Sequence, residues 1–185
     1  MNSIREKLIC HPDTPARAVT ALWAEVEWSF NDGFVLRFIV DGAIDQLVLP
    51  PGDGQLVIAD SPTDRLWQSS CFEAFLTDGE EPDYTEFNYA PDGRWACYQF
   101  DDYRSLLHSD DLMPWSMTVE RSPTQFVLRV EPGIFPDTGT LMALSVVIEE
   151  LDGTKSNWAL RHPSGKPDFH HPDCFTLSLG APDAA

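Results

Sequence analysis

Two carboxylates and an amide fall on one face of two predicted strands in the middle of the chain. Strict alternation along residues 71–76 (CFEAFL) places Glu73 on the face opposite Phe72 and Ala74. Along residues 84–90 (YTEFNYA), the same period puts Glu86 and Asn88 together on one face. Acidic and amide groups beside aromatic rings suit a sugar, which has apolar C–H faces and a rim of hydroxyls. The competing interpretation is that these are solvated outward positions of ordinary antiparallel strands.

Catalysis is the next possibility for these side chains. Glu73 and Glu86 are the residue types that glycoside hydrolysis uses as a pair. The sequence has no Ser-His-Asp ordering, G-x-S-x-G elbow, phosphate loop or H-E-x-x-H motif. We therefore expect a binding protein rather than an enzyme.

A histidine-rich segment near the end of the chain is a candidate metal site. Residues 165–173 (GKPDFHHPD) contain His170 and His171, and His162 precedes them. Neighbouring residues of an extended chain point in opposite directions, so His170 and His171 do not easily serve one metal. The prolines in this segment predict a stiff surface loop that closes over the site.

Cysteines and acidic pairs give weaker metal signals. The four cysteines are widely spaced and form no C-x-x-C pair, which indicates reduced thiols. The pairs Asp101–Asp102 and Asp110–Asp111 lack the loop spacing of an EF-hand, although a structural calcium stays an alternative. No cofactor is therefore expected.

The elements that must position these residues are short strands. Turn signals such as Asp41–Gly42, Asp92–Gly93 and Asp152–Gly153 separate runs of alternating or continuous apolar residues. The 15 prolines leave little room for stable helices. The pattern predicts an all-β sandwich or barrel with strands at 22–30, 34–40, 44–49, 56–59, 71–76, 84–90, 95–100, 117–121, 125–131, 141–150, 156–161 and 174–179.

The length and net charge of the chain limit the functions that it can have. The 185 residues predict one domain over 1–185, with 180–185 as a flexible tail. Twelve basic and 30 acidic residues give a net charge of −18, which disfavours nucleic acid and membrane surfaces and suits a neutral or cationic ligand. The first 15 residues lack a hydrophobic signal region, and no run reaches the roughly 20 apolar residues of a membrane span, so we expect a cytoplasmic protein.

Several blocks of the sequence carry a family resemblance. They are residues 64–75 (DRLWQSSCFEAF), 84–93 (YTEFNYAPDG), 100–104 (FDDYR), 158–163 (WALRHP) and 165–173 (GKPDFHHPD). In this order they resemble the DOMON-like proteins related to family-9 carbohydrate-binding modules, in a small bacterial subgroup. The resemblance implies a β-sandwich of two antiparallel sheets with a ligand site on its concave side.

The resemblance also implies a set of site residues. Two tryptophans clamp the sugar ring in the sugar-binding relatives, and by motif position these are Trp67 and Trp158, with Glu73 as the hydroxyl-binding carboxylate. In those relatives a basic residue stands on the strand where this chain has Glu86, so Arg104 or Arg161 is the candidate for the missing cation. The complete predicted ligand-binding set is Trp67, Glu73, Glu86, Asn88, Trp158 and Arg161.

The resulting prediction is a non-catalytic domain that binds a carbohydrate or a related polyol as its small-molecule partner. One alternative is a haem- or metal-binding DOMON-type domain, with Met113, Met117 or Met142 and the tail histidines as axial ligands. Another is an interaction module whose acidic surface docks a second protein.

Overall fold

A computed structural model describes residues 2–29, 33–135 and 139–180, and within them nearly all regular structure is β-strand. The strands are β1 (Asn2–Cys10), β2 (Val19–Ser29), β3 (Gly33–Gly42), β4 (Gly54–Gln55), β5 (Cys71–Thr77), β6 (Tyr84–Tyr89), β7 (Trp95–Asp102), β8 (Ser105–Asp110), β9 (Ser116–Arg121), β10 (Gln125–Glu131), β11 (Leu141–Glu149), β12 (Lys155–Ala159) and β13 (Leu177–Ser178). Three short 3₁₀ turns accompany them, namely η1 (Ile44–Gln46), η2 (Leu66–Gln68) and η3 (Pro172–Cys174). No helix among these described residues is long and apolar enough to span a membrane.

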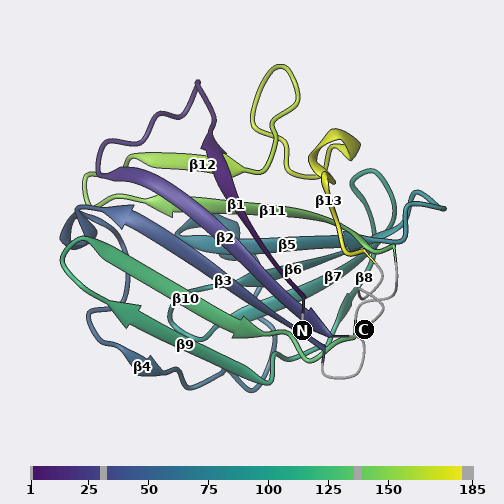
Figure 1. Cartoon of the computed structure of the whole chain (residues 1–185), viewed down its shortest axis with the longest axis horizontal. Coiled ribbons are helices and arrows are strands. Elements are labelled where there is room, and N and C mark those ends of the chain that lie inside the picture. Colours follow the sequence, from purple (N-terminus) through teal and green to yellow (C-terminus); the bar gives the residue numbers. More distant parts are fainter. Residues whose placement is uncertain (1, 30–32, 136–138, 181–185) are drawn as a thin grey trace.

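The strands form one curled 13-stranded antiparallel sheet whose two halves, called here the first and second sheets, face one another (Figure 1). The first sheet has the order β4-β9-β10-β3-β2-β1, and the second has the order β12-β11-β5-β6-β7-β8, with β13 beside β11. Strand β1 joins them, because it pairs with β2 up to Leu8 and then with β12 at Ile9 and Cys10. The predicted two-sheet antiparallel sandwich is confirmed.

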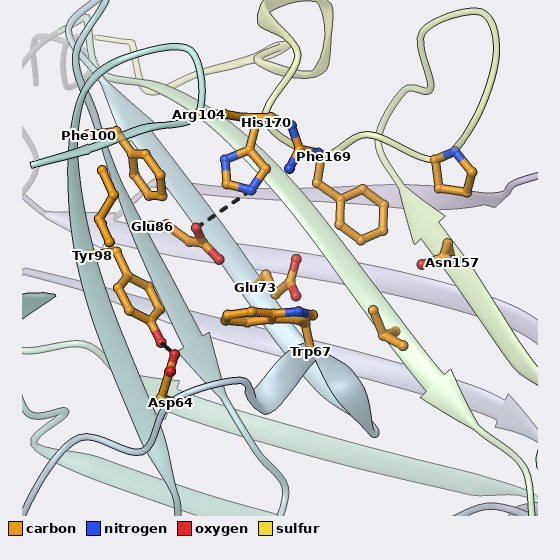
Figure 2. Close-up of a pocket in the computed structure, with 13 residues that line it drawn as sticks. Asp64, Trp67, Glu73, Glu86, Tyr98, Phe100, Arg104, Asn157, Phe169 and His170 are labelled. Atoms are coloured by element: carbon orange, nitrogen blue, oxygen red, sulfur yellow. Dashed lines mark hydrogen bonds and ion pairs between the residues drawn. The ribbon is translucent and has the colours of Figure 1, made fainter.

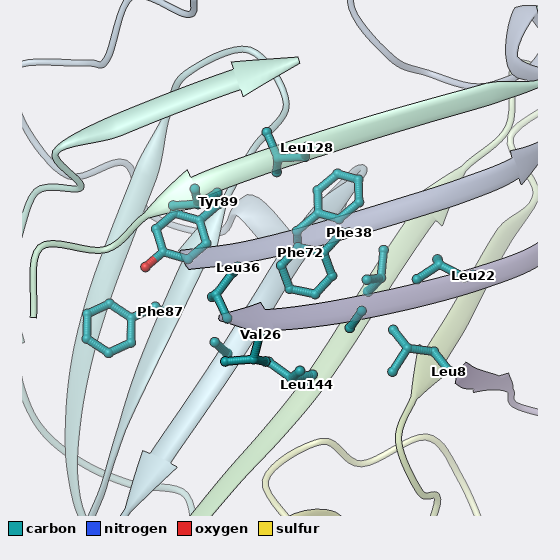
Figure 3. Close-up of a cluster of buried hydrophobic side chains, with 14 of the residues drawn as sticks. Leu8, Leu22, Val26, Leu36, Phe38, Phe72, Phe87, Tyr89, Leu128 and Leu144 are labelled. Atoms are coloured by element: carbon teal, nitrogen blue, oxygen red, sulfur yellow. The ribbon is translucent and has the colours of Figure 1, made fainter. Parts of the chain in front are cut away.

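The main hydrophobic core lies between the two sheets (Figure 3). Alternation along β2 turns Leu22 and Val26 inward, where they meet inward residues of β5 and β11 such as Phe72 and Leu144. The rings of Phe38 on β3 and Phe72 on β5 have centroids 5.4 Å apart and connect the two layers. One face of β5 thus packs in the core, and the other face points away from it, to the outer side of the second sheet.

A second, smaller hydrophobic cluster covers the outer face of the second sheet. It contains Phe75, Tyr84, Tyr98 and Phe100 from β5, β6 and β7, with Leu66 from η2 above them. Phe169 and Phe175, from the segment after β12, pack against this cluster before the chain returns to β11 as β13. A sheet with apolar cover on both faces explains why β5 is a nearly continuous buried run.

Some predicted strand positions were wrong. Residues 44–49 begin as the 3₁₀ turn η1, and 56–59 form no strand, although Ile44 and Leu47 are buried and Leu56 and Ile58 pack on the core. Residues 174–179 contain only the two-residue β13. These apolar runs reflect burial of single side chains rather than a ladder of paired strands. The sequence prediction also missed β1, β4 and β8, and its proposed tail, apart from Gly180, lies outside the described residues.

Candidate ligand-binding site

Strands β5 and β6 place two acidic side chains side by side on the outer face of the second sheet. Glu73 lies opposite Asn88 in the β5–β6 pairing, and Glu86 is two residues before Asn88 on the same face of β6. Glu73, Glu86 and Asn88 are 2%, 5% and 0% exposed. The alternative of solvated outward positions is therefore wrong.

Neighbouring strands supply hydrogen bonds to each carboxyl group. The Ser145 hydroxyl on β11 donates to Glu73 Oε2 at 2.8 Å, and Asn88 Nδ2 donates to Glu86 Oε1 at 2.7 Å. Cys71 Sγ in turn donates to Asn88 Oδ1 at 3.5 Å. One oxygen of each carboxyl is thus fixed by the protein, and both groups point into the same space (Figure 2).

Trp67 forms one wall of this space. It sits on η2, which begins after Arg65, a residue whose φ of 61° lies in the left-handed region that side chains with a Cβ rarely adopt. The indole is 43% exposed and meets the Tyr98 ring edge-on, with centroids 6.2 Å apart. The Tyr98 hydroxyl donates to Asp64 Oδ1 at 2.8 Å, which ties the segment before η2 to β7.

The histidine-rich segment closes the opposite side, as the sequence predicted. The His170 ring packs edge-on against Phe75 and Phe100 at 5.3 and 5.2 Å, and its Nδ1 lies 2.8 Å from the Tyr84 hydroxyl. That hydroxyl accepts the backbone N–H of Arg104, so its own hydrogen is free to point at Nδ1. This arrangement favours a proton on Nε2, the nitrogen 3.8 Å from Glu86 Oε2.

Asp168 anchors this segment to the β7–β8 turn. Arg104 Nη2 donates to its Oδ1 at 2.7 Å, and the Tyr103 hydroxyl also donates to its carboxylate. Arg104 has a φ of 56°, again in the left-handed region. The two residues with a Cβ and this backbone conformation among the described residues, Arg65 and Arg104, thus both border the site, where unusual backbone geometry is often found.

The resulting cavity has a volume of about 420 Å³, which lies in the range of small-molecule sites. It is open on one side and combines aromatic walls with a polar floor (Figure 2). Its lining residues are Asp64, Trp67, Glu73, Glu86, Tyr98, Phe100, Arg104, Leu106, Val147, Asn157, Pro167, Phe169 and His170.

Burial controls the ionisation of the groups on this floor. It raises the pKa of Glu73, and the neighbouring Glu86 raises it further against the Ser145 hydrogen bond. It also raises the pKa of Glu86, against the Asn88 hydrogen bond and the Arg104 charge. Burial and Arg104 lower the pKa of His170 to about 4. Near neutral pH the imidazole of His170 is therefore uncharged. The Glu73–Glu86 pair, taken together, still holds a proton.

The structure brings together only part of the predicted ligand-binding set. Trp67, Glu73 and Glu86 line the cavity, while the fully buried Asn88 supports Glu86 from beneath. Trp158 lies opposite Val146 in the β11–β12 pairing and belongs to the core between the sheets.

Arg161 is exposed and does not line the cavity, so Arg104 is the arginine that the geometry selects. Tyr98, Asn157 and Phe169 line the cavity but were not predicted from the sequence. Tyr98 could have been found, because alternation along β7 puts it on the face that pairs with Glu86. Phe169 lies in a loop, where the two-residue alternation of a strand does not determine the direction of a side chain.

The geometry does not support the cofactor alternatives. No cluster of three or more His, Cys, Asp or Glu suited to a metal occurs within residues 2–29, 33–135 and 139–180. His162 Nε2 lies 2.8 Å from the Ile9 carbonyl, and His171 Nδ1 accepts the backbone N–H of Asp173. Met117 and Met142 belong to the core between the sheets, and the exposed Met113 does not line the cavity that holds His170.

Comparison with known proteins adds a likeness of fold. No family model and no curated protein matches this sequence. One solved structure does match, from a Bacteroides uniformis protein described as a candidate carbohydrate-binding protein. The TM-score is 0.56 and the identity 15%, over 95% of this chain and 85% of that one. The two chains therefore share an architecture over nearly their full lengths.

Proposed function

We propose that this chain is a non-catalytic binding domain that holds a small carbohydrate or a related polyol in the cavity beside Trp67. The observation that carries the proposal is a half-exposed indole facing two buried carboxyl groups across one cavity. A sugar ring can stack its C–H face on the indole while its hydroxyls bond Glu73, Glu86 and Asn157.

Two further observations support the same ligand class. The Bacteroides uniformis protein of similar fold is described as a candidate carbohydrate-binding protein. The motifs around Trp67 and Glu73 resemble those of DOMON-like proteins and family-9 carbohydrate-binding modules. In this proposal Trp67 keeps the role of first clamp residue. Phe169, which lines the cavity from the tail segment, replaces Trp158 as the second aromatic wall.

The placement of the acids favours binding over hydrolysis. Glycoside hydrolysis needs two carboxyls that flank the scissile bond. Here Glu73 and Glu86 project from neighbouring strands of one sheet, so they meet a ligand from the same side. Each is also tied to the sheet by a hydrogen bond from Ser145 or Asn88.

Replacement of the indole tests the proposal. In titration calorimetry with D-glucose, D-glucosamine and N-acetyl-D-glucosamine, at least one sugar should bind, and the Trp67→Ala variant should lose at least about tenfold in affinity because stacking is removed. The free energy of unfolding should change by no more than about 1 kcal/mol, since the ring is half-exposed. The control is Trp115→Ala, which removes a 60% exposed indole outside the cavity and should leave affinity unchanged.

Two results would overturn the proposal. One is equal sugar affinity in the wild type and in the folded Trp67→Ala protein. The other is no heat of binding with any of these sugars.

A further inference from the structure

The cavity contains two buried carboxyl groups and no cation that is free to neutralise them among its described lining residues. Among the described residues that line the cavity, Arg104 is the one arginine or lysine, and its guanidinium is bound to Asp168 at 2.7 Å. His170 lies 3.8 Å from Glu86 but is neutral near pH 7, because burial lowers its pKa to about 4. The site is therefore short of positive charge, and a ligand can supply it.

The hydrogen-bonding capacity of the pair also matches a cation. Ser145 donates to one oxygen of Glu73, and Asn88 donates to one oxygen of Glu86. The second oxygen of Glu86 faces His170 Nε2 at 3.8 Å, which is too long for a hydrogen bond, so each carboxyl keeps acceptor capacity for donors in the cavity. Both carboxyls open onto the space beside the Trp67 ring (Figure 2). An ammonium group has three donors and no acceptor, so it can bond both carboxylates at once and lie near an aromatic face.

We propose, on the basis of the binding function above, that the ligand is an amino sugar or amino polyol whose ammonium group lies between Glu73 and Glu86. The hydroxyl groups of this ligand would contact Asn157 and Asp64 at the cavity rim. The protein's net charge of −18 attracts such a cation over longer distances.

Binding of an ammonium should release a proton. Burial raises the pKa of both carboxyls, so the free pair retains a proton near neutrality, and two carboxylates beside an ammonium do not. The proton passes to the buffer, and a neutral sugar requires no such release.

The other titratable groups around the pair do not compete for this role. Burial raises the pKa of Cys71 and Tyr98, and raises that of Tyr84 to about 12, so these three stay protonated. Asp168 stays ionised, because Tyr103 and Arg104 lower its pKa against the effect of burial. Asp64 at the rim bonds the Tyr98 hydroxyl.

The test compares D-glucosamine with D-glucose and N-acetyl-D-glucosamine by titration calorimetry in two buffers of different ionisation enthalpy. We expect glucosamine to bind at least about tenfold more tightly than the other two, as befits charge-assisted hydrogen bonds. The buffer dependence should show proton release for glucosamine alone. Glu73→Gln and Glu86→Gln should abolish this preference, whereas Glu131→Gln, on β10 of the other sheet, removes the same charge and should keep it.

The outcomes separate this inference from the proposed function. If glucose or N-acetylglucosamine binds as tightly as glucosamine, the inference is overturned while carbohydrate binding stands. If no sugar binds, both are overturned. The proton release is measured on the unmodified protein, so the test remains decisive even where a Gln variant fails to fold.

Discussion

At the scale of single residues, the unusual feature is a pair of carboxyl groups inside the protein. Glu73 and Glu86 are nearly inaccessible, and Ser145 and Asn88 compensate only part of the lost hydration. A raised pKa is the physical consequence, because the protonated form costs less to bury. Such groups are retained at a cost in stability, which is typical of functional sites.

Because burial raises the pKa of Glu73, the free energy of unfolding depends on pH. The folded protein holds a proton on Glu73 above the ordinary carboxyl pKa of 4.5, so it binds more protons than the unfolded chain there. The contribution of Glu73 to stability therefore falls as pH rises from the unfolded pKa toward the raised folded one. His170 acts in the opposite direction between pH 4 and 6.5, because its folded pKa is lowered.

Glu73→Gln isolates the carboxyl effect. The stability of this variant relative to the wild type should increase as pH rises from about 5 to about 7, by at most roughly 1.4 kcal/mol per pH unit. Denaturant unfolding at several pH values measures both proteins, and subtraction cancels the His170 contribution. A difference that is flat or decreases with pH would show that Glu73 ionises normally in the folded state.

At the scale of elements, strand alternation predicted one part of the site and not the other. The two-residue alternation of side chains along a strand correctly placed Glu73, Glu86 and Asn88 on one face, because this alternation depends only on local backbone geometry. Trp158 was assigned by motif resemblance, and the register of β12 against β11 instead turns it into the core. His170 reaches Glu86 from a loop 84 positions later, a contact that no strand period encodes.

Two of the missed strands, β1 and β8, have a similar explanation. Most of β1 is exposed or half-buried, and its run of charged residues hides the alternation. Strand β8 is an edge strand whose side chains are almost all exposed, so it has no apolar face to detect. Both are held by backbone pairing with a neighbour rather than by a hydrophobic pattern.

The segment over the cavity depends on Asp168 for its position. Asp168→Ala removes the contacts with Tyr103 and Arg104 and the hydrogen bond that Asp168 accepts from the His170 amide. The backbone amide of Phe169, which has no such bond to Asp168, should therefore exchange with solvent at least about fivefold faster, equivalent to roughly 1 kcal/mol of local opening. Hydrogen exchange measures this directly, and sugar affinity should weaken with it. Asp152→Ala breaks an exposed ion pair with Arg17 and serves as the control. Unchanged exchange at Phe169 would mean that ring packing alone holds the segment.

At the scale of the whole molecule, the sandwich separates stability from binding. The core between the sheets contains Phe38, Phe72 and Trp158, while the outer face of the second sheet holds the carboxyls and the cavity. The architecture shared with the Bacteroides uniformis protein concerns this framework, at 15% identity. Specificity must therefore come from the side chains and the loop that this sequence places over the face.

The most direct test of the central claim is to locate a bound sugar on the folded protein. Isotope-labelled protein would be titrated with glucose, glucosamine and N-acetylglucosamine and followed by amide and indole N–H correlation spectra. The account predicts saturable shifts at the Trp67 indole and at the amides of Phe169 and His170, with the Trp115 indole unchanged. An unchanged Trp67 signal, or shifts confined to the outer face of β2, β3 and β10, would contradict it.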